Sequence, residues 1–399
     1  MLLNICFALG QSRKTAYLCN MRHATFAILL LLSAALHAQQ TFRGRVVDAS
    51  TGEPLPYVEI SVSQKLRTLS NRHGIFAVEA RTKNMLIFSH VGYEEVEMVP
   101  TDNVEVKMWP LKYEPSGMSE AEIENVLKKT KKVFSSRLEG HDKKSRLYYY
   151  RFFCCGQDES RLSEAIMKAC SANNLRKLEY IRHVFYNDVS DETSGEMPLY
   201  LRRTFINNVL QLGPNPLNAS VWRNMLVRIP FSFREEVLSS KYHLECDVVK
   251  DGDKTLLYRI HLYPHEEVSN RESTMVDADS TIVLPAPTVF FNRGILAGTM
   301  YLNNKKQLVS FDGELLDYGI ETVTHGWLSA TAGVHIDYVH DHKYPEVKVA
   351  VGELEYDGIY SRAFVFNITK PDSEAELSRI IPQTEEEKAV ITKYLKQKE

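Results

Sequence analysis

The stretch GRVVDASTGEPLPYVEISV, residues 44–62, decides the first domain of this chain. It holds two runs of alternating apolar and polar residues, with glycine and proline between them. Alternation of this kind is typical of a strand with one buried face, and glycine and proline are typical of the turns that join strands. A further short strand is expected at KLRTLS (65–70), and the same pattern recurs in GIFAVEA (74–80), MLIFSH (85–90), YEEVEMV (93–99) and VEVKMW (104–109). We therefore expect seven short strands before residue 110, arranged as a β-sandwich.

Three ordered motifs carry a family resemblance: the opening stretch, NRHGIFAV (71–78) and LIFSHVGYEEVEM (86–98). Residues 39–110 thereby resemble the carboxypeptidase-regulatory-like domain, a transthyretin-like sandwich common in exported Bacteroidetes proteins. Ser70-Asn71 departs from the Thr-Asp that the family often has before its turn. The resemblance implies an accessory module, and the family name does not imply peptidase activity. The remainder of the chain resembles uncharacterised exported Bacteroidetes proteins that carry this domain.

The rest of the chain is also predicted to be mainly β. Residues 111–145 are expected to be a linker and a helix, because Ser119 and Glu122 form a capping box ahead of apolar residues at helical spacing. Residues 146–370 alternate between strand patterns and short turns such as Asp251-Gly252, which favours a larger antiparallel β-sheet domain with a few helices. Residues 371–399 are helical in character.

The N-terminal segment is typical of a leader that is removed. Residues 21–40 combine one arginine, an apolar run and small residues, as a secretory signal peptide does. We expect a signal peptide over residues 1–38 with Met21 as the true start, and one long leader from Met1 as the alternative. The mature chain is then exported, to the periplasm or in association with the outer membrane. No other apolar stretch is long enough to span a membrane.

Composition excludes several classes of function. The 399 residues are 44% hydrophobic and 25% charged, as in ordinary globular proteins. The net charge of −3 becomes −6 once three basic residues leave with the leader, which argues against nucleic acid as a partner. Nucleotide-binding glycine loops, hydrolase serine elbows and zinc-protease helices do not occur in the sequence. We expect no cofactor.

Four cysteines remain in the mature chain: Cys154, Cys155, Cys170 and Cys246. Their spacing matches neither a disulfide framework nor a zinc site. Cys154 and Cys155 are adjacent on a predicted strand, so their side chains point to opposite faces. Free buried thiols are therefore expected, and a bridge from Cys246 to Cys154 or Cys155 is the one pair that deserves a test.

One predicted strand carries aromatic residues on both faces. Tyr148, Tyr150 and Phe152 share one face, while Tyr149 and Phe153 share the other. Such a strand is either covered on both sides or lines a pocket. The first three residues are therefore the candidates for an apolar groove, and a covering helix or loop is the alternative.

The segment HIDYVHDH, residues 335–342, holds the densest group of metal-binding side chains. His335 and Asp337 share one strand face, and His340 and His342 share the other. The candidate metal ligands are His340 and His342, with Asp337 as support from a turn. Histidine pairs are common at zinc sites, but no third ligand is evident, and a polar strand end is the alternative.

These observations lead to three hypotheses. The first is an exported, non-catalytic binding or interaction protein of the bacterial cell envelope, associated with outer-membrane uptake machinery. Its partner would be an envelope protein or a glycan or lipid ligand. The second is a periplasmic carrier of a lipid or other apolar ligand in the second domain. The third is a metal-dependent hydrolase that uses the histidine pair.

Overall fold

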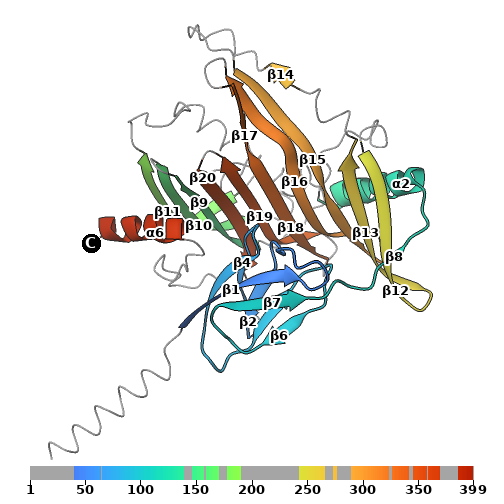
Figure 1. The fold of residues 1–399 in the computed structure, drawn as a ribbon, viewed down its shortest axis with the longest axis horizontal. Helices are drawn as coiled ribbons and strands as arrows, with labels where there is room; N and C mark the ends of the chain where they lie inside the picture. Colours follow the sequence, from blue (N-terminus) through green and yellow to red (C-terminus); the bar gives the residue numbers. More distant parts are fainter. Residues whose placement is uncertain are drawn as a thin grey trace, which may run out of the picture.

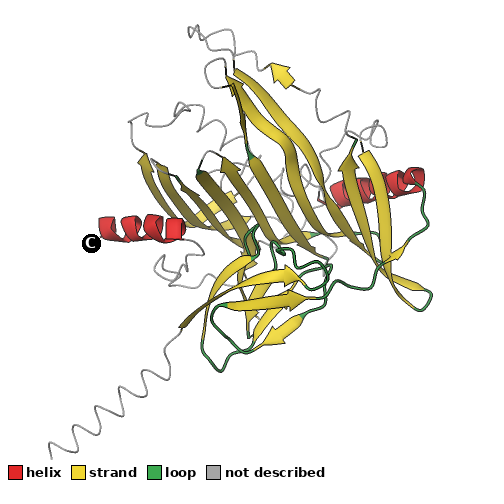
Figure 2. Ribbon diagram, in the orientation of Figure 1, coloured by secondary structure: helices red, strands yellow, loops and turns green. Residues whose placement is uncertain are grey.

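The computed structural model is mainly β, with two described helices (Figures 1 and 2). The structure describes residues 40–63, 65–138, 146–156, 159–169, 178–189, 242–265, 273–275, 289–322, 326–340, 345–356, 358–368 and 385–398. The predicted signal peptide, Cys170 and His342 lie outside these residues. None of the helices in the described part of the chain has both the length and the apolar character needed to cross a bilayer.

The N-terminal unit consists of seven strands in two sheets, as predicted. One sheet has the order β4-β1-β7 and the other β3-β2-β5-β6. The bounds are β1 Gln40–Asp48, β2 Glu59–Val62, β3 Lys65–Leu69, β4 Ile75–Ala80, β5 Leu86–Ser89, β6 Val96–Met98 and β7 Val104–Met108. Strands β1 and β7 are parallel and the other pairs are antiparallel. The alternating residues of both sheets meet in one core that includes Val46, Ile60 and Phe88.

The turn that precedes β4 is fixed by side-chain hydrogen bonds and by a glycine. The side-chain oxygen of Asn71 accepts hydrogen bonds from the backbone N–H groups of His73 and Ile75. Gly74 has a φ of 72°, and a Cβ there would lie 2.4 Å from the carbonyl oxygen of Val46. Asparagine and glycine are therefore required at these positions to turn the chain next to β1.

The second unit is a 13-stranded sheet. Its main path runs β11-β10-β9-β20-β19-β18-β16-β15-β13-β12-β8, with β14 paired to β15 and β17 paired to β16. The bounds are β8 Glu114–Pro115, β9 Arg146–Cys155, β10 Glu159–Ala169, β11 Leu178–Val189, β12 Tyr242–Asp251, β13 Lys254–Pro264, β14 Ser273–Met275, β15 Val289–Asn303, β16 Leu308–Thr322, β17 Gly326–Ser329, β18 Thr331–Val339, β19 Glu346–Tyr356 and β20 Ile359–Ile368. All of its pairs are antiparallel, and the predicted hairpin turn at Gly252 has a φ of 58°.

The connection between the two units contains the predicted capped helix, α2 (Glu120–Leu138). The carboxylate of Glu122 accepts hydrogen bonds from both the backbone N–H and the hydroxyl of Ser119, at 2.8 Å each. The linker also contributes β8, which pairs with β12 at the edge of the sheet. The sequence predicted an irregular linker for these two residues. They form a strand because they contact β12, which is distant in the sequence, and not because of their local sequence pattern.

Both faces of the aromatic strand β9 are covered. Tyr150 and Phe152 belong to the main core, which also contains Ile123 and Leu127 of α2. On the other face, Phe153 packs with Val390 and Ile391 of the C-terminal helix α6 (Glu385–Lys398). Figure 2 shows α2 and α6 at opposite ends of the sheet. Cys154, Cys155 and Cys246 are buried, and none of the three is joined in a disulfide.

Candidate functional site

The sandwich lies against one face of the large sheet, over β16, β18, β19 and β20 (Figure 1). We call this contact the seam. Its residues are Tyr57, Glu59, Leu69, Arg72 and His90 of the sandwich and Asp312, His335, Asp337, Lys348, Val349, Val351, Glu353 and Arg362 of the sheet. An apolar part joins Tyr57 and Leu69 to Val349 and Val351. The rest of the seam is mostly charged.

The most buried ion pair of the seam is formed by Arg362 and Glu353. Its Nε and Oε1 atoms are 3.0 Å apart, and the two side chains are 5% and 0% exposed. The guanidinium of Arg362 also donates to the backbone carbonyls of Leu69 and Ser70 in the sandwich, at 3.2 and 3.3 Å. The other oxygen of Glu353 accepts a hydrogen bond from the backbone N–H of Arg72, at 2.9 Å. One ion pair of the sheet therefore binds the backbone of residues 69–72 of the sandwich.

A second ion pair crosses the seam between Glu59 of β2 and Lys348 of β19. The Nζ atom of Lys348 donates to Oε2 of Glu59 at 2.6 Å, and the Glu59 side chain is 6% exposed. Burial and the nearby carboxylate of Asp337 raise the pKa of Glu59, and Lys348 offsets part of that rise. The lysine therefore supplies the charge that Glu59 needs to remain ionised in the seam.

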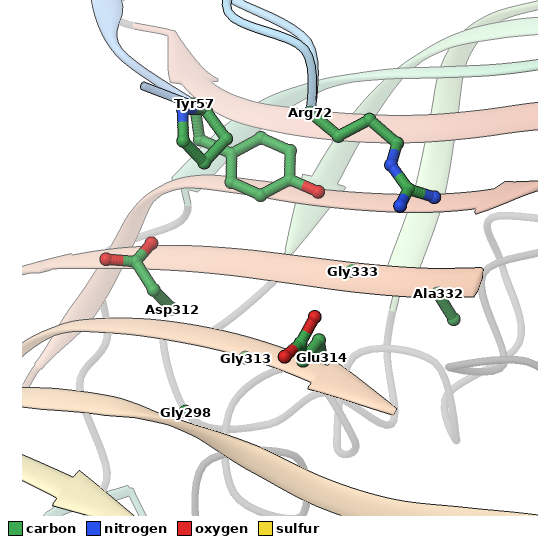
Figure 3. A pocket seen from close by; sticks show the side chains of 9 residues that line it. Tyr57, Arg72, Gly298, Asp312, Gly313, Glu314, Ala332 and Gly333 are labelled. Atoms are coloured by element: carbon green, nitrogen blue, oxygen red, sulfur yellow. The ribbon is translucent and has the colours of Figure 1, made fainter. Parts of the chain in front are cut away.

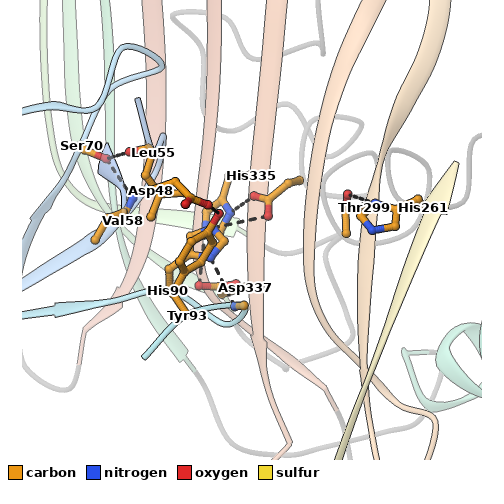
Figure 4. Close-up of polar contacts among 12 residues, drawn as sticks. Asp48, Leu55, Val58, Ser70, His90, Tyr93, His261, Thr299, His335 and Asp337 are labelled. Atoms are coloured by element: carbon orange, nitrogen blue, oxygen red, sulfur yellow. Dashed lines mark hydrogen bonds and ion pairs between the residues drawn. The ribbon is translucent and has the colours of Figure 1, made fainter. Parts of the chain in front are cut away.

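Four further groups form a chain across the seam (Figure 4). Nε2 of His90 lies 3.5 Å from Oδ2 of Asp312, and the other oxygen of Asp312 lies 2.5 Å from Nδ1 of His335. Nε2 of His335 lies 3.2 Å from Oδ2 of Asp337. Burial opposes charge on His335, but the carboxylates of Asp337 and Asp312 raise its pKa well above the usual value. Burial would raise the pKa of Asp312, but the charge of His335 and hydrogen bonds from His335 and His90 hold it far below the usual value.

The donor atoms of His90, Asp312 and His335 lie within 4.8 Å of one another, so their spacing alone would admit a metal ion. The hydrogen bonds argue against it. Nδ1 of His90 accepts a hydrogen bond from the backbone N–H of Gly92 at 3.3 Å, so the neutral ring carries its proton on Nε2, the atom that faces Asp312. Both nitrogens of His335 face carboxylates and therefore carry protons. A metal ion binds to a lone pair on a histidine nitrogen. In this cluster the histidine nitrogens that face carboxylates carry protons, so the contacts form a proton network rather than a metal site.

Tyr57 occupies a strained position in the seam. Its ring stacks on His335 with centroids 5.6 Å apart and planes inclined by 19°. Its φ is 58°, in the left-handed region that bulky residues rarely adopt. Such strain costs about 1–3 kcal/mol and tends to occur at functional positions. Burial and the charge of Glu353 raise the pKa of Tyr57 well above the usual value, so its hydroxyl keeps its proton.

A pocket of about 280 Å³ opens beside Tyr57, between the sandwich and the sheet (Figure 3). Tyr57 and Arg72 reach into it from the sandwich, and Glu314 reaches into it from β16. Its full lining is Pro56, Tyr57, Arg72, Gly298, Asp312, Gly313, Glu314, Ala332 and Gly333. The pocket therefore has a hydrogen-bond donor wall and a carboxylate wall, supplied by different units of the chain.

Three glycines on neighbouring strands make the floor of the pocket. Gly298 of β15 is directly opposite Gly313 of β16, and Gly333 of β18 is opposite Glu314. A Cβ on Gly333 would lie 2.5 Å from the hydroxyl oxygen of Tyr57. Glycine at 333 is therefore what allows this hydroxyl to approach the sheet.

The residues singled out from the sequence lie in three different places. Asp337 is in the seam, where it pairs with His335 rather than with the predicted histidine pair. Nε2 of His340 contacts the backbone carbonyl of Leu308, and His342 lies outside the described residues. The groove candidates Tyr148, Tyr150 and Phe152 are 6%, 1% and 1% exposed and belong to the main core.

Sequence reasoning missed most of the seam, although one signal was available. A strand whose core face is apolar should carry ordinary surface residues on its other face. In β18 that other face carries His335 and Asp337, a positive and a negative group two residues apart. Such a pair indicates a covered polar face. The sequence did not reveal that Asp312 and His90 complete the network.

Comparisons with known proteins bear on the N-terminal part of the chain. No curated protein matches the sequence. A crystal structure of a Bacteroides fragilis protein of unknown function, described as membrane-associated, is similar at 9% identity over 83% of this chain and 98% of that chain. Its TM-score is 0.15, so this likeness supports no statement about fold or function. The family model of the CarboxypepD_reg-like domain matches residues 42–121. The N-terminal unit of this chain, with its seven-stranded sandwich, is therefore a CarboxypepD_reg-like domain.

Proposed function

We propose that this chain is an exported, non-catalytic binding protein of the bacterial cell envelope, whose ligand site is the pocket in the seam. The observation that carries the proposal is the lining of that pocket by both units, with Tyr57 and Arg72 on one wall and Glu314 on the other. Small-molecule sites are typically concave and lie between structural units, with a few fixed polar groups. The CarboxypepD_reg-like domain then acts as one wall of the site rather than as a catalytic module.

Two properties of the seam support a preformed site. The ion pairs of Arg362 and Lys348 hold the sandwich against the sheet, so the two walls keep a fixed separation. The left-handed backbone of Tyr57 stores strain at the pocket wall, as ligand sites often do. Preformed walls reduce the ordering cost of binding. Export is supported by the leader-like residues 21–40, and association with outer-membrane uptake machinery remains part of the proposal.

The two alternative functions receive no specific support from the described residues. A carrier would need an open apolar groove, whereas Tyr148, Tyr150 and Phe152 pack in the main core beside α2. A metal-dependent hydrolase would need free histidine nitrogens, whereas His340 contacts a backbone carbonyl and the seam histidines share protons with carboxylates.

The test is a saturation-transfer NMR screen of the full protein against pooled small sugars, amino acids, nucleosides and fatty acids. Glu314→Trp should abolish the binding of any hit, because an indole at this exposed strand position covers the glycine floor. Glu245→Trp is the matched control, since Glu245 is an exposed glutamate on β12 that does not line the pocket. Unchanged binding to Glu314→Trp would refute the seam site. Turnover of a bound compound would refute the non-catalytic function.

A further inference from the structure

The chemistry of the pocket walls indicates which class of ligand they recognise. On the sandwich wall, Arg72 lines the pocket with a side chain that is 25% exposed, and its buried Nη1 lacks a hydrogen-bond partner among the described residues. The hydroxyl of Tyr57 also faces no described partner at hydrogen-bond distance and keeps its proton. This wall therefore offers hydrogen-bond donors.

The opposite wall offers an acceptor. Glu314 is exposed to the pocket, and no described residue pairs with its carboxylate. Asp312 lines the same wall, but its oxygens are already engaged by His335 and His90. A ligand that fills the pocket therefore needs an acceptor group at one side and a donor group at the other.

The net charge of the donor wall favours a neutral ligand over a zwitterion. Nη1 of Arg72 lies 3.8 Å from the carboxylate of Glu355, and the backbone N–H of Arg72 donates to Glu353. The carboxylate of Glu355 balances the charge of Arg72. Glu353 is already paired with Arg362, and both carboxylates would repel a ligand carboxylate. Arg72 thus offers its N–H groups without a surplus of positive charge.

The floor and the size of the pocket narrow the class further. Gly298, Gly313 and Gly333 present peptide groups without side chains, which suits a flat ring. Pro56 adds only a small apolar surface, and the side chain of Ala332 packs in the main core on the other face of the sheet, so a lipid chain would find little to contact. A volume of about 280 Å³ is at the lower limit for small-molecule sites.

We propose that the seam pocket binds a neutral polyhydroxylated ring, that is, one or two sugar residues of a glycan. Hydroxyl groups on opposite edges of the ring accept from Arg72 and Tyr57 and donate to Glu314, while a ring face lies on the glycine floor. This inference rests on the proposed function, because it assigns a ligand class to the same site.

The experiment measures the binding of four neutral disaccharides, maltose, cellobiose, lactose and N,N′-diacetylchitobiose, to the full protein by titration calorimetry. Glycylglycine, L-alanine and palmitate are the competing classes. We expect at least one disaccharide to bind, with affinity reduced at least tenfold by Glu314→Ala and changed less than twofold by Glu245→Ala. Tyr57→Phe should weaken it severalfold, because only the hydroxyl is lost. Affinity for a neutral ligand should also stay constant between low and high salt.

The outcomes separate the ligand class from the site. Binding of glycylglycine, L-alanine or palmitate that depends on Glu314, with no disaccharide binding, would overturn the sugar assignment and leave the seam site intact. Disaccharide binding that is unaffected by Glu314→Ala would overturn the assignment of the pocket. If no compound of any class binds at the seam, both the ligand class and the proposed function are wrong.

Discussion

Nε of Arg362 lies 3.0 Å from Oε1 of Glu353, and the same guanidinium donates to two backbone carbonyls of the sandwich. Removal of one partner from a buried ion pair leaves the other charge uncompensated, at a cost of about 3–5 kcal/mol. Arg362→Ala should therefore lower the free energy of unfolding by about that amount. Urea denaturation followed by circular dichroism measures it. Arg45→Ala, at an exposed site, is the control and should change stability by less than about 0.5 kcal/mol. A loss at Arg362 no larger than the control would show that the pair does not hold the seam.

The protonated state of His335 predicts a dependence of stability on pH. Its pKa in the folded chain is raised above the ordinary value of 6.5, so its contribution is complete below pH 6.5 and is lost as pH rises towards the raised value. Stability should fall above pH 6.5, by at most about 1.4 kcal/mol per pH unit. Urea denaturation between pH 6 and 9 measures this slope.

Two variants isolate the origin of that slope. His335→Gln should flatten it, because the titrating ring is gone. The raised pKa of Glu59 acts in the same direction, so Glu59→Gln measures the separate share of this carboxyl in the slope. An unchanged slope in His335→Gln would assign the dependence to another group. Asp312 and Asp337 have lowered pKa values, so their contribution is lost only in acid.

The proton network of His90, Asp312 and His335 predicts that added metal does not change the stability of the protein. A ligand that binds only the folded state raises the melting temperature. Because the histidine nitrogens carry protons that the carboxylates accept, zinc chloride or a chelator at neutral pH should leave the melting temperature unchanged. Thermal denaturation with and without each additive measures this. A rise with zinc that disappears in His90→Gln would instead establish a metal site.

The close approach of Tyr57 to Gly333 predicts a specific steric conflict. A Cβ at residue 333 would lie 2.5 Å from the hydroxyl oxygen of Tyr57 but 3.6 Å from its ring carbon. Gly333→Ala should therefore destabilise the protein by about 1–3 kcal/mol, as overpacking does. The same substitution in a Tyr57→Phe background should cost clearly less. Equal costs in the two backgrounds would place the conflict elsewhere, and a double-mutant cycle by urea denaturation distinguishes the two cases.

The strands and turns of the sandwich could be predicted because local sequence specifies them. The turn at Asn71 and Gly74 and the hairpin at Gly252 depend on neighbouring residues and on a positive φ. The capped start of α2 at Ser119 is equally local. In these elements the conformation depends on residues that are close together in the sequence, so the elements can be predicted from a single sequence.

The seam could not be predicted, because its partners are distant along the chain. His90 meets Asp312, and Glu59 meets Lys348, only once the two units dock. The sequence grouped Asp337 with His340 and His342 as candidate metal ligands, whereas in the structure Asp337 pairs with His335. The Arg362 and Glu353 pair carried no local signal, because charged residues on a strand ordinarily face water.

The two-residue strand β8 has a consequence for how strongly the two units are held together. Pro110 is bridged to Tyr93 in the sandwich, and Glu114 is already paired with Val248 in the sheet. Leu111 also donates its backbone N–H to the carbonyl of Gly92, so only Lys112 and Tyr113 lie between the last backbone contact with the sandwich and the first with the sheet. A tether this short keeps the effective concentration of one surface near the other in the millimolar range or above. The charged seam needs only a weak intrinsic affinity to stay closed, and the sandwich would return to the same site after any local opening.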